Sequence, residues 1–239
     1  MTQAESPNRS RILTGLTVVA AIMFVAAVGM ALFYAPTEAQ QGHVQRVFYP
    51  HLGSFMGGAL AFLIAAIASA LYLIRRDRKW DTLALSSVEV GLVLSGFNIA
   101  SGAIWARPIW NTWWTWDPRL TSAAIMWLAY AAYLMLRNGL EDPDRRARFA
   151  AVYGIVAFSS VIFTTIVTRV RPDTIHPVVI GSGPQNAQGD FGLTPAMRTT
   201  LIVNIITFVV LSITLIWHRI RLENLSQRVT ALKMKVLSR

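Results

Sequence analysis

Two of the four histidines are the residues of this chain best suited to bind a metal. His51 follows the run R-V-F-Y-P, and His176 lies in a stretch rich in Gly, Pro and polar residues between two long apolar runs. We expect His43 to be solvated in a loop and His218 only to end the last apolar helix. Neutral imidazole is the commonest metal ligand in proteins. Two histidines from different segments could therefore clamp one planar iron porphyrin from both faces.

A dense cluster of tryptophans lies between these two histidines in the chain. Residues 105–121 read W-A-R-P-I-W-N-T-W-W-T-W-D-P-R-L-T, and five of the eight tryptophans fall between Trp105 and Trp116. Aromatic belts of membrane proteins spread tryptophans over many helix ends, so this density exceeds what anchoring requires. A haem needs axial nitrogens, an apolar or aromatic wall and cations for its propionates. The cations available nearby are Arg107, Arg119, Arg169 and Arg171.

Composition places these residues in a membrane protein. Of the 239 residues, 54% are hydrophobic and 14% are charged, against about 25% charged in an ordinary soluble domain. The chain has no cysteine, which excludes disulfides, thiolate metal sites, cysteine nucleophiles and covalent haem attachment through C-x-x-C-H within this chain. A haem held here would therefore be a non-covalent haem b.

Six continuous apolar runs are the elements that must position the histidines and tryptophans. Continuous runs in lipid predict helices, since an alternating pattern would be needed for a barrel. The first run has 22 residues and is too long for a signal-peptide core, so we expect it to be retained. The predicted spans are Ile12–Phe33, Leu52–Ile74, Thr82–Ile104, Leu120–Leu136, Phe149–Thr168 and Met197–Trp217. The fold class is therefore an all-α integral membrane protein.

The distribution of basic residues predicts the topology. Sixteen of the 22 lysines and arginines lie on one side of the six spans, and the positive-inside rule places that side and both termini in the cytoplasm. The net charge of +10 is thus a topology signal and calls for no nucleic-acid partner. The outer side holds both candidate histidines and the tryptophan-rich loop. We predict a transmembrane domain over residues 1–218 and a cytoplasmic amphipathic tail over residues 219–239.

Several residues leave alternatives open. Pro108 favours a short interfacial helix or a broken turn after the third span. The Asp117 carboxylate could cap the next helix or pair with a nearby arginine. Glu89 is a functional candidate because it lies within a span, although it could equally snorkel or pair with the basic residues that follow the second span. In the tail, the 3-4 spacing of apolar residues from Leu222 to Val236 predicts an amphipathic helix on the inner leaflet or a short docking helix for a cytosolic partner.

The string W-N-T-W-W-T-W-D-P-R-L-T resembles the tryptophan-rich "WWD" signature of haem-handling proteins in cytochrome c biogenesis. Within that superfamily, the length, the six spans and the two outer histidines are similar to those of the haem exporter protein C family. The resemblance covers nearly the whole chain. Asn111 stands where the family usually has Gly, and the segments beside both histidines also differ from the family pattern, as in L-G-S-F-M after His51 and R-P-D-T-I-H-P around His176. These departures are compatible with a branch whose partner chaperone differs.

The resemblance implies a non-enzymatic protein of the plasma (inner) membrane. It would hold haem at the periplasmic face and present it to a membrane-anchored haem chaperone for cytochrome c maturation. It would associate with the membrane and ATPase subunits of an ABC transporter, so that ATP hydrolysis resides in a partner. The implied axial ligands are His51 and His176. The implied haem-binding residues are Trp110, Trp113, Trp114, Trp116, Asp117 and Arg119, to which Arg107 adds a candidate propionate partner.

Other classes of function compete with this one. A b-type electron-transfer cytochrome would be expected to bury histidine pairs within its spans, and no predicted span has an internal histidine. A haem transporter channel would be expected to break helices or place polar groups at mid-membrane. Ser95 and Asn98, together with glycines of the third span, fit that expectation but fit close helix packing equally well. The larger haem lyase of the same superfamily would need further spans and histidines.

Overall fold

The computed structural model describes residues 7–171, 173–176 and 192–238. All regular elements in these residues are helical. They are α1 (Pro7–Gly29), the π-helical turn η1 (Met30–Tyr34), the 3-10 helix η2 (His43–Val47), α2 (Phe48–Arg75), α3 (Arg78–Trp110), α4 (Pro118–Asn138), α5 (Pro143–Val170) and α6 (Pro195–Leu237).

The six α-helices of the described residues are each long and apolar enough to cross a membrane, α1 together with η1. Each predicted span lies within the corresponding helix. This confirms the prediction of an all-α integral membrane protein with six spans.

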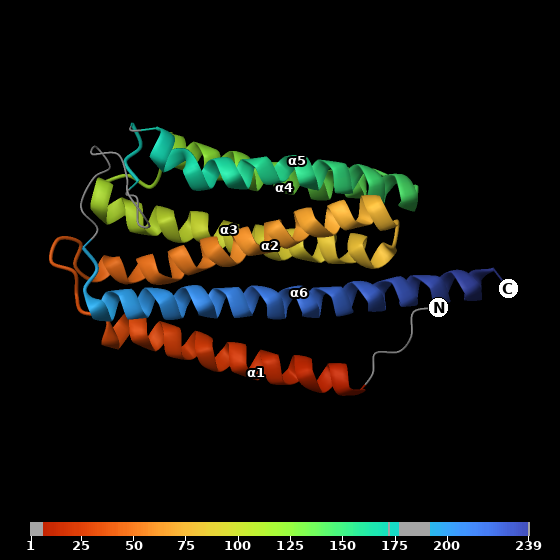
Figure 1. The fold of residues 1–239 in the computed structure, drawn as a ribbon, viewed down its shortest axis with the longest axis horizontal. Helices are drawn as coiled ribbons and strands as arrows, with labels where there is room; N and C mark the ends of the chain where they lie inside the picture. Colours follow the sequence, from red (N-terminus) through yellow and green to blue (C-terminus); the bar gives the residue numbers. More distant parts are fainter. Residues whose placement is uncertain (1–6, 172, 177–191, 239) are drawn as a thin grey trace.

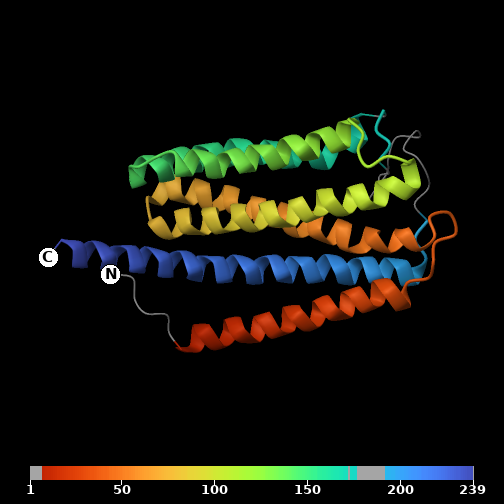
Figure 2. The ribbon, with the colours of Figure 1, turned by 180° about the vertical axis from the view of Figure 1, so that it is seen from behind.

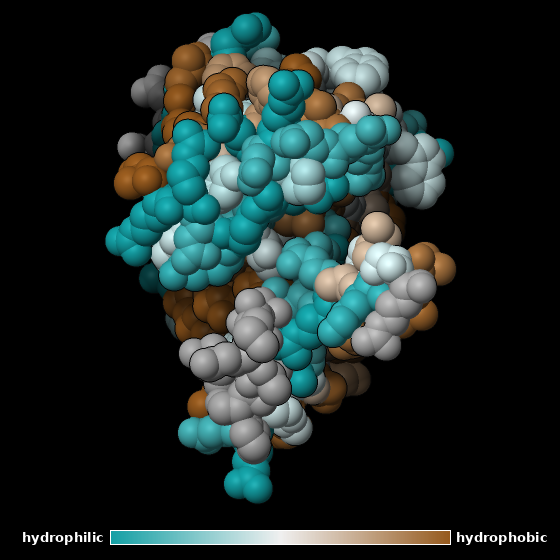
Figure 3. Space-filling view, turned by 90° about the vertical axis from the view of Figure 1, so that its right-hand side faces the viewer, coloured by the Kyte–Doolittle hydropathy of each residue, from teal (hydrophilic) through white to brown (hydrophobic). Residues whose placement is uncertain are grey.

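The helices run side by side as one elongated bundle (Figures 1 and 2). The central helix is α2, which packs against α3, α5 and α6. The α4–α5 pair lies on one side of the bundle, and α1 lies on the other side against α6. We call the end that holds His51 and the α3–α4 connection the histidine end. The opposite end, where α1 begins and α6 ends, is the basic end. Figure 3 views the basic end along the bundle and shows hydrophilic side chains gathered over it.

Three helices begin at a capping residue followed by proline. Asp117, Asp142 and Thr194 each accept a hydrogen bond from a backbone N–H of the first turn of the helix that follows. The proline then occupies the first helical position, where its missing N–H costs nothing. The structure thus confirms the first alternative for Asp117: its side chain accepts from the Arg119 N–H at 2.9 Å and caps α4. This cap sets where the α3–α4 connection ends.

The third helix continues further than the sequence predicts. α3 runs through Pro108 to Trp110, and it replaces the separate interfacial helix or broken turn expected there. Pro108 has no N–H to donate to the Ile104 carbonyl, and the helix ends two residues beyond it. The helix ends at Asn111, whose φ of 53° is left-handed, a conformation that asparagine adopts more readily than most residues. Arg107 Nη1 donates to the Asn111 carbonyl at 2.7 Å and helps to close this end.

The sixth helix also differs from the prediction. We expected His218 to end it, but α6 continues without a break to Leu237, because no Gly or Pro follows Pro195 to stop it. The His218 ring instead lies 2.8 Å from Thr17 Oγ1 in α1.

Of the alternatives for Glu89, pairing with the basic residues that follow the second span is wrong. Glu89 pairs with Arg219 of α6, with Oε2 2.5 Å from Nε, since the two helices lie side by side here.

Close packing holds the middle of the bundle. The rings of Phe62 in α2 and Tyr130 in α4 stack at 3.7 Å between centroids. Gly91 of α3 lies against Phe62, where an added Cβ would approach the ring to 2.5 Å. Ser95 donates to the Gly91 carbonyl within its own helix at 2.7 Å. The small residues of α3 in this region therefore serve close helix packing.

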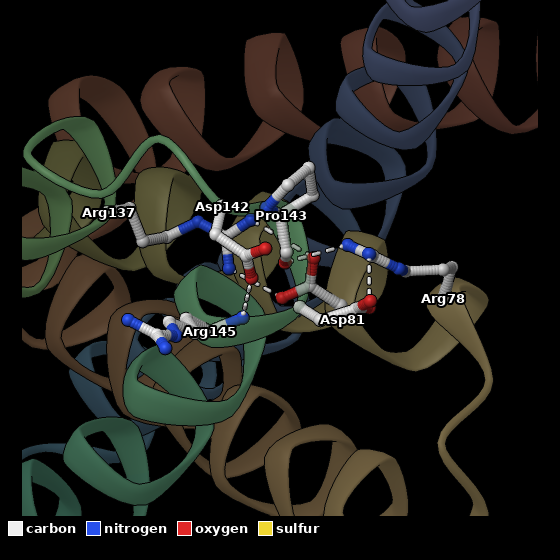
Figure 4. A network of polar contacts seen from close by, with 7 residues as sticks. Arg78, Asp81, Arg137, Asp142, Pro143 and Arg145 are labelled. Carbon is white, nitrogen blue, oxygen red and sulfur yellow. Dashed lines mark hydrogen bonds and ion pairs between the residues drawn. The ribbon is translucent and has the colours of Figure 1, made fainter.

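Ion pairs join the helices at the basic end (Figure 4). Arg137 of α4 and Asp81 of α3 form a buried pair, with Nη1 2.5 Å from Oδ1. Arg78 of α3 reaches α5, where it donates to the Pro143 carbonyl at 2.9 Å and to the Asp144 carboxylate at 2.5 Å. These contacts fix α3, α4 and α5 to one another at the end opposite the candidate site.

Candidate functional site

His51 lies in the first turn of α2 and rests on one face of α3. Its Nδ1 is 3.0 Å from the backbone oxygen of Asn98 and 3.2 Å from Oγ of Ser101. A carbonyl oxygen can only accept, so Nδ1 carries the proton and Nε2 keeps its lone pair. An oriented histidine of this kind is typical of metal sites, where the second ring nitrogen is held by a carbonyl or carboxylate.

Two more features of α3 fix the position of His51. Asn98 Nδ2 donates to the His51 carbonyl at 2.8 Å and ties α2 to α3 at this level. Gly102 leaves room for the imidazole, since a Cβ there would lie 2.9 Å from His51 Cε1. Asn98, Ser101 and Gly102 fall on one face of α3 because they are spaced three and four residues apart. We call these three residues the α3 cradle.

His176 reaches the same region from the segment that follows α5. Its backbone N–H donates to Thr174 Oγ1 at 3.2 Å, and that hydroxyl donates to Asp117 Oδ1 at 2.8 Å. Thr115 Oγ1 donates to the other Asp117 oxygen at 2.9 Å. The carboxylate that caps α4 therefore also ties the α5–α6 connection to the tryptophan stretch.

The ring of His176 has an unused nitrogen. Its Nδ1 is buried and has no hydrogen-bond partner among the described residues, which is costly unless a ligand satisfies it. Burial, and then the charges of Arg119 and His51, lower the pKa of His176 far below its ordinary value. The ring is therefore neutral at physiological pH and able to bind a metal. Contacts bring the three residues to one region: Arg119 lies over Phe55, one turn of α2 after His51, and Thr174 ties the segment of His176 to Asp117, beside Arg119.

Arg119 is a partly buried cation beside both histidines. Its guanidinium lies 4.6 Å over the Phe55 ring of α2 and donates from Nη1 to the Thr164 carbonyl of α5. No carboxylate in the described part of the chain lies within ion-pair distance of it. The Asp117 carboxylate acts on this partly buried charge without forming an ion pair with it, so an added anionic group at the site would be met favourably.

The indoles divide into two groups by burial. Trp110 lies beside His176, with ring centroids 5.4 Å apart, and meets Trp105 edge to face at 5.3 Å. Trp114 Nε1 is buried without a partner in the described residues. In contrast, Trp113 is 58% exposed and Trp116 is 77% exposed. Trp105 and Trp110 lie at the histidine site. Trp114 meets Trp116 edge to face, with ring centroids 5.6 Å apart, and Trp113 and Trp116 face outward.

The structure brings together most, but not all, of the predicted site residues. His51, His176, Arg119, Asp117 and the inner indoles converge at the histidine end. Arg107 is exposed, and its guanidinium is hydrogen-bonded to Asn111 at the end of α3. Sequence reasoning missed the α3 cradle, although Asn98, a polar residue within a span, was a usable signal. It also missed Thr174 and Phe55, which carry no pattern of their own.

Fold and site together define a class: a multi-pass α-helical membrane protein with paired histidines and an indole wall at one end of the bundle. Sequence comparison then identifies the family. The profile of heme exporter protein C matches residues 4–235, and the chain belongs to that family.

Curated relatives agree with this assignment. The heme exporter protein C of Bradyrhizobium diazoefficiens is 30% identical over 225 residues, covering 92% of this chain and 82% of the relative. That of Paracoccus denitrificans is 28% identical over 200 residues, covering 84% and 81%. The Escherichia coli K12 protein of the same name is 27% identical over 190 residues, covering 79% and 74%.

Proposed function

We propose that this protein holds one haem b non-covalently between His51 and His176 and presents it for cytochrome c maturation. The observation that carries the proposal is the convergence of two neutral imidazoles from separate segments. One has its Nδ1 bonded to α3, and the other has a buried nitrogen without a partner in the described residues. Two such rings meet the need of a haem iron for axial ligands.

The surroundings of the two imidazoles fit the rest of a haem. The two propionates are anionic, and Arg119 is a partly buried cation with no carboxylate of the described residues in ion-pair distance. The porphyrin is flat and apolar, and Trp110 offers indole surface beside His176. We assign Arg119 as the propionate partner in preference to Arg107, because Arg107 is exposed and bonded to Asn111. The chain itself then binds and orients haem as cargo and catalyses no reaction.

Presentation to a partner is supported by the outward-facing indoles. Trp113 and Trp116 are large aromatic residues left mostly exposed at the histidine end, and exposed aromatic residues are enriched in protein interfaces. We propose that they contact a membrane-anchored haem chaperone. The relatives are named heme exporters. This name supports the proposal that the protein acts within an ABC transporter whose ATPase is a separate subunit. The surplus of Lys and Arg at the basic end supports a cytoplasmic basic end and a periplasmic histidine end in the inner membrane.

Haem content of the purified protein tests the proposal. The chain is purified in mild detergent, saturated with haem b and washed, and haem is measured per chain after acid–acetone extraction. We expect one extractable haem per chain. The double variant His51→Ala/His176→Ala is expected to lose more than about tenfold in haem affinity, because both iron ligands are gone.

The other two histidines provide a matched control. His43→Ala/His218→Ala removes the same number of imidazoles outside the site, and we expect it to bind haem as the parent does. Equal retention of haem by both double variants would contradict the ligand assignment. Two haems per chain would favour an electron-transfer cytochrome instead.

A further inference from the structure

The last part of α6 leaves the bundle. A helix of 43 residues is about 65 Å long, whereas the hydrocarbon core of a membrane is about 30 Å thick. Figures 1 and 2 show the end of α6 projecting past the ends of α2, α3, α4 and α5. We call residues 219–237 the α6 extension.

The α6 extension carries an apolar stripe that the described residues do not cover. Its five members are 43% to 70% exposed. They are spaced three and four residues apart, which places them at the a and d positions of two heptads. Two of the three a positions are valine, and both d positions are leucine, a combination that favours two-stranded coiled coils. The stripe consists of Leu222, Leu225, Val229, Leu232 and Val236.

Four of the five positions that flank this stripe are basic. In this register the e and g positions are Arg221, Ser226, Arg228, Lys233 and Lys235. The one acidic residue of the extension, Glu223, lies at a b position away from the seam. Charges at e and g decide which helices pair. Two copies of this helix would place basic residues against basic residues in either orientation, so a partner with acidic flanks is favoured over a second copy.

The start of the extension is fixed to the bundle. Arg219 lies between two carboxylates, with Nε 2.5 Å from Glu89 Oε2 and Nη1 3.1 Å from Glu223 Oε2. No Gly or Pro follows to bend the helix. A helix that continues straight from a membrane span cannot lay its apolar side on the membrane surface. The stripe is therefore displayed away from the lipid.

We propose that the α6 extension is a docking helix for a protein partner that presents an acidic amphipathic helix at the basic end. The two helices pair through the a and d stripe, and the acidic flanks of the partner meet Arg228, Lys233 and Lys235. Two heptads form only a weak coiled coil on their own. A partner held in the same membrane assembly would compensate through its high effective concentration. This inference does not depend on haem binding.

The test uses the full chain in nanodiscs of neutral phosphatidylcholine and two designed peptides. Both peptides carry three heptads with Val at a and Leu at d; one has Glu at e and g, and its twin has Lys there. Fluorescence anisotropy measures binding at low and high salt. We expect the Glu peptide to bind at least about tenfold more tightly than the Lys twin, with the difference shrinking at high salt.

Three variants make the result specific. Leu225→Asp/Leu232→Asp is expected to abolish binding, whereas Ala231→Glu, on the opposite side of the helix, is expected to leave it nearly unchanged. Arg228→Glu/Lys233→Glu/Lys235→Glu is expected to reverse the preference, so that the Lys twin binds more tightly. Failure of the Glu peptide to bind, or equal binding of both peptides, would overturn the proposal.

Two other partners of the apolar stripe, lipid and a second copy of the chain, would give different experimental results. Because the chain has no cysteine, Ser226→Cys allows a single environment-sensitive dye at an exposed e position beside the stripe. Burial of that dye when phosphatidylglycerol replaces phosphatidylcholine would show that the occupant is lipid. Dimers in mass photometry that disappear in Leu225→Asp/Leu232→Asp would show that it is a second copy. Either result would overturn the proposal.

Discussion

Buried charges at the basic end face partners of opposite sign. Arg137 pairs with Asp81, and Arg219 lies between Glu89 and Glu223. At the histidine end, Arg119 is partly buried against a carbonyl and an aromatic ring, and His176 Nδ1 has no partner in the described residues. Satisfied pairs of this kind hold helices in place, whereas buried groups left without partners are costly unless a ligand meets them. The basic end thus serves to hold the helices together, and the histidine end is the one for which we propose ligand binding.

Removing Arg137 is expected to have the largest effect on stability. Arg137→Met leaves the Asp81 carboxylate buried without its partner, and we expect a loss of about 3–5 kcal/mol in the free energy of unfolding. Denaturant unfolding in detergent measures it. Asp81→Leu/Arg137→Met removes both charges and is expected to recover most of the loss. Haem bound per folded chain should stay unchanged; its loss from folded Arg137→Met protein would contradict the separation of the two ends.

A methyl group in the α3 cradle is expected to disturb the histidine end directly. Gly102→Ala would place a Cβ 2.9 Å from His51 Cε1, so the imidazole must move. Overpacking of this kind costs about 1–3 kcal/mol, and we expect haem affinity to fall about tenfold. Haem titration followed by absorbance measures it. Gly15→Ala, where an added Cβ meets nothing within 4 Å, is the control, and equal affinities in the two variants would show that α3 does not position His51.

Arg119 is expected to tune the iron as well as hold the haem. Removing a nearby positive charge disfavours the reduced state. We expect Arg119→Gln to lower the midpoint potential by an amount on the order of 50–100 mV, as a unit charge at 5–10 Å contributes about 1–3 kcal/mol. Arg119→Lys keeps the charge and is expected to restore most of the potential. Spectroelectrochemistry measures both, and an unchanged potential in Arg119→Gln would contradict the placement of this cation beside the haem.

Substitution of the outward-facing indoles is expected to have the smallest effect on stability. Trp113→Leu and Trp116→Leu change mostly exposed side chains, and we expect changes within about 0.5 kcal/mol in the free energy of unfolding. The rate of haem transfer from these two variants to apomyoglobin should be nearly that of the parent protein. Trp110→Leu removes an indole that contacts His176 and should speed haem loss. Equal rates in all three variants would remove the distinction between the two groups of indoles.

The sequence predicts the helices well because their signals are strong and local. Long apolar runs define six spans, and the Asp117–Pro118 pair marks the start of α4 as a cap followed by proline. The ends of α3 and α6 are predicted less well. α3 continues two residues past Pro108, and no Gly or Pro after Trp217 stops α6. The last apolar residue of a span therefore does not mark the end of its helix.

The two candidate ligands of the site are conspicuous in the sequence, whereas the residues that position them are not. His51 and His176 are rare residue types, so they are conspicuous in the sequence. The partners that orient them depend on how helices pack. Asn98 orients the His51 ring through its backbone carbonyl, which every residue has, and Thr174 bonds to Asp117, 57 positions away in the chain. Contacts of this kind follow from tertiary structure alone.

Electron paramagnetic resonance of the ferric haem-loaded protein tests the central claim most directly. If His51 and His176 both bind one iron, the parent will show a low-spin bis-histidine signal. Each single variant, His51→Gly or His176→Gly, will turn high-spin, and added imidazole will restore the low-spin signal by filling the vacated position. A low-spin signal that persists in both single variants without imidazole would contradict the account.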